Sequence, residues 1–205
     1  AQGTVSISGR VTDFDGNPVD SAWVGLYYSD FSTAYETVSD KDGYYSLDNV
    51  SKGKYMAMYA LRIKEYPRLD LVPDDDKRLE FWAWNVIADR DLTINPRYHR
   101  LELYGTNVFK VEGGYRGLFI YTRPMSTTKF LTYSKEIQQN KALAERMVAD
   151  ISVKPEFFRA RVFIDDEEVR VNSVQQVQEY VGHESLGMGA FIIQVEVPKE
   201  IPDKP

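Results

Sequence analysis

The side chains with the clearest capacity for chemistry in this chain are aromatic. Trp82 and Trp84 stand two residues apart, and positions i and i+2 of a strand point to the same side. A flat aromatic face stacks on the apolar face of a sugar ring, and a tyrosine adds a hydroxyl group. We therefore take Trp82, Trp84, Tyr27 and Tyr44 as the candidate ligand-binding residues. Packing of the tryptophan pair at a domain junction is the alternative, which we favour because an inserted segment must bury something to stay ordered.

Acidic side chains offer no complete metal site. Oxygen atoms of the kind that Ca²⁺ binds are provided by Asp13, Asp15, Asn17 and Asp20. Their spacing differs from that of an EF-hand loop, because Gly16 does not stand where that loop has its glycine and the glutamate of the twelfth position is missing. An Asp-x-Asp-Gly-Asn sequence is also typical of an ordinary turn. We expect no metal and no cofactor.

Residues for nucleophilic or acid–base catalysis are sparse. The chain has no cysteine, and His99 and His183 are its only histidines. Ser185 follows His183 closely, but no Gly-x-Ser-x-Gly motif is present, and a catalytic serine needs a base held beside it. Among 31 acidic residues, no pair stands out as the two carboxylates of a glycosidase. We expect a protein that is not an enzyme.

Composition narrows the class of partner and the compartment. The net charge is −6 without any block of Lys and Arg, which argues against a nucleic-acid partner. No apolar run approaches the roughly 18 residues of a transmembrane helix. The start at Ala1–Thr4 suits a mature, processed form. An extracellular eukaryotic domain would carry disulfides, so the lack of cysteine indicates a bacterial protein that is secreted, periplasmic or on the cell surface.

The first half of the chain reads as short strands separated by turns. Apolar and polar residues alternate over 5–11, as in a half-buried strand, and Asp42–Gly43 is a hairpin signal. Further strand patterns cover 22–28, 44–47, 55–60, 81–86 and 89–96. The run 74–78 has the charge of an exposed loop. Short strands at this spacing predict an antiparallel sandwich.

The motifs of this half resemble the carboxypeptidase regulatory-like domain. The segments that carry the resemblance are 9–13, 16–19, 22–24, 40–45 and 53–55. The resemblance implies a transthyretin-like (prealbumin-like) sandwich, whose last strand we expect at 89–96. It also implies a non-catalytic accessory module, of the kind found on bacterial surface and outer-membrane proteins, commonly in Bacteroidetes, and on some peptidases.

The second half resembles no family that we can identify. We place the domains at 1–97 and 98–205, the second being a mostly-β domain with one or two short helices. A loop or short helix is predicted up to Ala144, followed by a strand to Val153, and a hairpin surrounds 165–168. Ser173 with Gln176 forms a capping box, which predicts a helix ending at Gly182.

The interpretation that combines these features is a non-catalytic, secreted or cell-surface bacterial module that binds or spaces. Its candidate partner is a glycan or a surface protein. Two alternatives stay open. One is a hydrolase with its site in the second half, and the other is a subunit of a surface fibre whose edge strands pair with a neighbouring chain.

Overall fold

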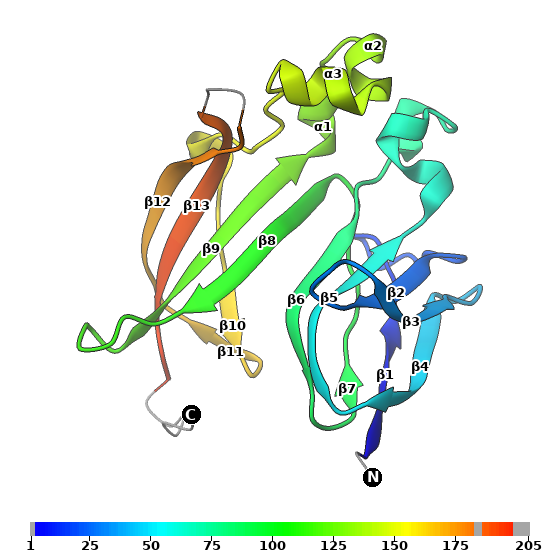
Figure 1. Ribbon diagram of the computed structural model, residues 1–205. Coiled ribbons are helices and arrows are strands. Elements are labelled where there is room, and N and C mark those ends of the chain that lie inside the picture. The colour runs from blue at the N-terminus through cyan, green and yellow to red at the C-terminus, as the bar shows by residue number, and fades with distance from the viewer. Residues whose placement is uncertain (1–2, 183–185, 199–205) are drawn as a thin grey trace.

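The computed structural model describes residues 3–182 and 186–198. Two β units lie side by side, and three short α-helices gather at one end of the molecule (Figure 1). The predicted all-β fold class is therefore confirmed. No helix in the described part of the chain is long and apolar enough to cross a membrane.

The first unit is a sandwich of two sheets. One sheet has the strand order β4-β1-β7, and the other has the order β3-β2-β5-β6. Neighbouring strands are antiparallel except β7, which runs parallel to β1. The strands are β1 (Thr4–Arg10), β2 (Trp23–Tyr27), β3 (Thr33–Val38), β4 (Tyr44–Ser51), β5 (Gly53–Leu61), β6 (Phe81–Ala88) and β7 (Leu92–Thr93).

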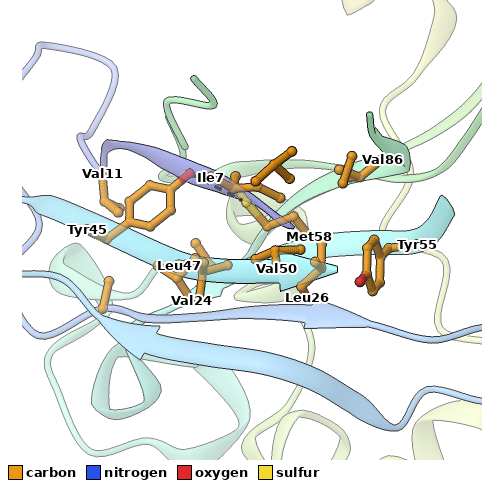
Figure 2. Close-up of a cluster of buried hydrophobic side chains, with 14 of the residues drawn as sticks. Ile7, Val11, Val24, Leu26, Tyr45, Leu47, Val50, Tyr55, Met58 and Val86 are labelled. Carbon is orange, nitrogen blue, oxygen red and sulfur yellow. Dashed lines mark hydrogen bonds between the residues drawn. The ribbon is translucent and has the colours of Figure 1, made fainter. Parts of the chain in front are cut away.

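The core of this unit lies between the two sheets (Figure 2). Ile7 of β1, Leu26 of β2 and Met58 of β5 are fully buried, because alternate residues of a strand share a face and these residues take the inner one. Burial of each such side chain stabilises the fold by about 1.5–3 kcal/mol. The strand expected at the end of the sandwich forms as β7, and Tyr98 beyond it is also fully buried in this core.

A loop of short 3-10 helices joins β5 to β6. The helices are Ile63–Glu65, Pro67–Leu69 and Asp74–Asp76. The prediction of an exposed loop holds for Asp74–Asp76 but is wrong for Lys77, whose side chain is fully buried. Its ammonium group lies 2.6 Å from a carboxylate oxygen of Asp74 and also pairs with Asp70. A buried ammonium requires such partners.

The second unit is built on one four-stranded antiparallel sheet in the order β12-β13-β9-β8. Its core is small, and the ring of Phe158 stacks on that of Phe191 with 4.0 Å between ring centroids. A two-stranded hairpin of β10 and β11 forms around the acidic turn, as predicted. The strands are β8 (Leu101–Phe109), β9 (Gly117–Ser126), β10 (Val162–Ile164), β11 (Glu167–Val169), β12 (Val171–Tyr180) and β13 (Leu186–Glu196).

The helix predicted from Ser173 to Gly182 is wrong, because this segment is strand β12. It pairs with β13 along nearly its whole length. The capping pattern is a local signal, whereas the valines at positions 174 and 177 are β-branched and favour strands. The long strand β13 also needs a partner for its backbone groups on this side, and β12 provides it.

The strand predicted up to Val153 is also wrong. Three helices occupy the region before it: α1 (Thr127–Phe130), α2 (Lys135–Gln139) and α3 (Lys141–Arg146). The side chain of Asn140 caps α3 by accepting a hydrogen bond from the Leu143 amide. Val148 then has a positive φ of 50°, which interrupts an extended chain. Only Ser152 forms a β-bridge, opposite Met125.

The division at residues 97 and 98 stays a prediction, and fragments test it. Because Tyr98 is buried in the first core and its amide donates to the carbonyl of Thr12 (3.1 Å), we expect a fragment 1–100 to unfold cooperatively. We expect a fragment 1–97 to unfold at a clearly lower temperature. Circular dichroism during heating makes the comparison. If both fragments were unfolded, the two halves would share one cooperative unit.

Candidate functional site

A row of six aromatic side chains crosses the outer face of the sheet β3-β2-β5-β6 and reaches the second unit. In the strand register Tyr59 of β5 lies opposite Trp82 of β6, and the two-residue spacing places Trp84 on the same face. The members of this aromatic row are Trp23, Tyr27, Tyr59, Trp82, Trp84 and Tyr104.

The tryptophan pair lies at the junction of the two units. The indoles of Trp82 and Trp84 stack with 4.8 Å between centroids and an interplanar angle of 15°. Tyr104 of β8 meets both rings edge-on, at 5.7 Å and 5.1 Å, which is a favourable aromatic geometry. Both indoles are partly buried, so the pair packs against the second unit and also keeps some surface open.

Two backbone features produce this outer face. Gly25 lies beneath the indole of Trp23, and a Cβ there would stand 2.8 Å from a ring atom. Asn85 has a left-handed φ of 56°, a conformation that asparagine tolerates better than most residues. The side-chain alternation of β6 changes at this residue: Trp84 lies in the aromatic row on the outer face, whereas Val86, two positions later, lies in the core.

A groove of about 600 Å³ runs between β6 and β8. Trp82 and Trp84 line it, and their role in ligand binding stays a prediction. Amide side chains stand beside the indoles, because Asn85 and Asn107 also line the groove and both are exposed. The only charged residue in the lining is Lys54. We call this feature the β6–β8 groove.

The other two candidate residues lie outside the groove lining. Tyr27 belongs to the aromatic row, with its ring centroid 6.1 Å from that of Trp82. Tyr44 is on β4 in the opposite sheet, where its exposed ring lies under the guanidinium of Arg10 at 5.4 Å. The structure therefore brings three of the four predicted residues together, and Tyr44 is not among them.

A second recess, which we call the junction cavity, measures about 490 Å³ and contains a pair of carboxyl groups. The carboxyl of Glu102 accepts from the backbone amide of Glu80 at 3.4 Å, and Glu80 accepts from the indole N–H of Trp82 at 2.9 Å. Glu102 is only 3% exposed. We call these two residues the carboxyl pair. Sequence reasoning missed the pair because its members are 22 positions apart and belong to different units.

Burial controls the ionisation of the carboxyl pair. It raises the pKa of Glu80, although hydrogen bonds from Trp82 and Tyr59 oppose the rise. Burial raises the pKa of Glu102 well above its ordinary value, and the neighbouring charge of Glu80 raises it further. Because the charge of Glu80 raises the pKa of Glu102, the two carboxyl groups resist being ionised together.

Asp13 and Asp20, which the sequence offered as calcium ligands, have separate structural partners. The carboxylate of Asp13 accepts from the amides of Asp15 and Asn17, both at 2.9 Å, and so fixes the turn. Asp20 instead pairs with Arg62 at 2.8 Å. No cluster of metal-ligating residues occurs within 3–182 and 186–198. His183 and Ser185 lie outside the described residues.

Replacement of Trp82 by alanine should destabilise the protein. The substitution empties a junction site and removes the hydrogen bond to Glu80, so we expect the free energy of unfolding to fall by about 3 kcal/mol. The exposed Tyr44→Ala is the matched control and should change it by less than about 0.5 kcal/mol. Urea denaturation followed by fluorescence of the remaining tryptophans measures both. Equal effects would show that the tryptophan pair carries no junction packing.

Replacement of Glu102 by glutamine should make the stability of the protein fall less as the pH rises from acidic to mildly alkaline values. The pKa of Glu102 is raised by folding, so this carboxyl favours the folded state at low pH, and that contribution is lost as pH rises through the folded pKa. From about pH 5 to about pH 8 the unfolding temperature of the original protein should therefore fall relative to that of Glu102→Gln. The exposed Glu145→Gln serves as the control. Parallel curves for all three proteins would contradict the prediction.

Comparison with solved structures finds distant likenesses. A protein of Bacteroides uniformis ATCC 8492, provisionally named a carbohydrate binding protein, is 12% identical with a TM-score of 0.35, and the match covers 61% of this chain and 54% of that one. Fervidolysin from Fervidobacterium pennivorans, a keratinolytic enzyme related to subtilisin, is 16% identical with a TM-score of 0.33, covering 59% and 20%. BcpA, the major pilin subunit of Bacillus cereus, is 13% identical with a TM-score of 0.31, covering 97% and 60%.

These likenesses are too distant to carry an argument about function. The chain matches about half the length of the first structure and a fifth of the second. No curated protein matches. The model of one family does match, over residues 6–81, and these residues hold the turn and strand motifs described above. The N-terminal part of the chain is a carboxypeptidase regulatory-like domain.

Proposed function

We propose that this chain is a non-catalytic glycan-binding module and that the β6–β8 groove is its binding site. The observation that carries the proposal is the stacked pair of Trp82 and Trp84 in the lining of that groove. An indole that keeps part of its face open offers a sugar ring an apolar surface without further rearrangement. The stacking also fixes the orientation of both rings before a ligand arrives, which lowers the entropy lost on binding.

The polar groups around the groove suit a saccharide. Asn85 and Asn107 each carry an amide that both donates and accepts hydrogen bonds, as sugar hydroxyl groups do. Lys54 adds three donors at the same groove. Because the lining contains no acidic residue, the groove favours neutral or anionic saccharides over cationic ligands.

The family supports a binding role over catalysis. Residues 6–81 match the carboxypeptidase regulatory-like domain, and this resemblance implies a non-catalytic accessory module. Within the proposal, the chain is secreted, periplasmic or attached to a bacterial surface, where polysaccharides are abundant.

A surface-assembly subunit is the second candidate. It is favoured by β6 and β8, each of which pairs on one side only and presents its other edge towards the groove.

Asn107→Ala should weaken retention on a polysaccharide affinity gel by about three- to tenfold, which corresponds to one lost hydrogen bond. Trp84→Ala should weaken it by about tenfold or more, because the stacking surface is removed. The first variant is the more informative, since Asn107 is exposed and its loss should leave the unfolding temperature unchanged. Tyr44→Ala, on the opposite sheet, should retain full binding.

Retention that survives both substitutions would contradict the groove as the site. A different result would favour the assembly candidate. Size-exclusion chromatography would then show self-association that grows with protein concentration, and Trp84→Ala would abolish it. The groove would then hold a strand of a second copy.

A further inference from the structure

The junction cavity has walls from both units and from the helices at their end. Tyr66 comes from the loop before β6, and Tyr104 comes from β8. Ile137 of α2 and Ala144 of α3 add apolar surface. Its volume of about 490 Å³ lies within the usual range for small-molecule sites, which are mostly apolar with a few converging polar groups. The carboxyl pair supplies such groups.

The carboxyl pair lacks a cationic partner. Among the ion pairs formed by residues 3–182 and 186–198, none involves Glu80 or Glu102. This is unusual for a carboxyl as deeply buried as Glu102, which is only 3% exposed. Buried carboxyl groups are ordinarily paired, strongly hydrogen-bonded or protonated.

The basic residues that line the cavity bind elsewhere. Arg123 forms an ion pair with Glu179 at 2.8 Å, and its guanidinium stacks on Tyr104 at 4.9 Å. Arg68 donates to the carbonyl of Gln138 at 3.1 Å and lies over the ring of Phe130.

The third basic residue, Lys141, is 3.7 Å from the carboxylate of Glu145. The positive charges of Arg123 and Lys141 act on the carboxyl pair from a distance. None of the three basic residues of the lining therefore forms an ion pair with the carboxyl pair.

We propose that the junction cavity binds a small organic cation, with a primary ammonium group on the carboxyl pair and an apolar body against the surrounding wall. An ammonium donates three hydrogen bonds and brings the positive charge that lets both carboxyl groups ionise. The rings of Tyr66 and Tyr104 line the same cavity, and aromatic faces attract cations. The side chains that would hold the apolar body are Met125, Phe130, Ile137 and Ile151.

This site is separate from the β6–β8 groove. Trp82 stands between them, because its ring lines the groove while its indole N–H is bonded to Glu80 in the cavity. The two sites differ in their acidic groups, since the groove lining holds none and the cavity lining holds the carboxyl pair. Loss of one binding activity therefore leaves the other testable.

The experiment compares hexylammonium with 1-hexanol, which has the same chain length and no charge. At about pH 7.5 hexylammonium should raise the unfolding temperature of the full chain in a concentration-dependent way, because it binds the folded state, whereas hexanol should not. Calorimetry in two buffers of different ionisation enthalpy should show proton release on binding, because a bound ammonium favours the ionised form of both carboxyl groups. At about pH 5 the affinity should be lower, because both carboxyl groups hold protons more fully.

Glu80→Gln and Glu102→Gln should each weaken hexylammonium binding about tenfold or more. Glu112→Gln, the same change at an exposed carboxyl that pairs with Lys110 outside the cavity lining, should bind as the original protein does. Equal stabilisation by hexanol would overturn the proposal and make the cavity a site for neutral apolar molecules. Unchanged binding in both glutamine variants would also overturn the proposal, because variants that bind are folded. The absence of any effect of hexylammonium on the original protein would overturn it as well, and that result involves no variant.

Discussion

Tyr104 lies edge-on against both indoles of β6, and among the described residues no backbone hydrogen bond joins β6 to β8. Between β6 and β8 the units therefore meet through side chains rather than through a continuous sheet. An aromatic contact tolerates this arrangement, because it needs no register between the strands. The remaining space between the two strand edges is the β6–β8 groove, so the same contact that holds the units together also creates the recess.

Trp82 links that contact to the junction cavity. Its ring takes part in the aromatic row, and its indole N–H donates to the carboxyl group of Glu80. Glu80 in turn brings Glu102 close through its backbone amide. A buried polar network of this kind is costly unless every member is satisfied. Both carboxyl residues line the junction cavity, from which a further partner can reach them.

The sequence predicted the parts of the fold that depend on local pattern. Alternation over 5–11 and the Asp42–Gly43 turn led directly to the first sandwich, and the spacing of Trp82 and Trp84 placed both rings on one face. The errors came where a partner far along the chain decides the structure. The capping box at Ser173 was outweighed by pairing with β13. The carboxyl pair could not be recognised either, since only folding brings Glu80 and Glu102 together.

The charged cluster around Lys77 extends across to the helices, because Lys135 of α2 also binds Asp70, at 2.9 Å. The two lysines differ in exposure: Lys77 is fully buried, whereas the side chain of Lys135 is 50% exposed. Hydrogen bonds from both lysines lower the pKa of Asp70 to about 2. The carboxylate of Asp70 therefore stays ionised, and the link persists, until the solution becomes strongly acidic. Ionic strength acts differently on its two arms. Salt screens interactions between exposed charges more strongly than those of buried ones. At high ionic strength we therefore expect the link from Lys135 to weaken before the link from Lys77, so that α2, which lines the junction cavity through Ile137, is held less firmly than the loop.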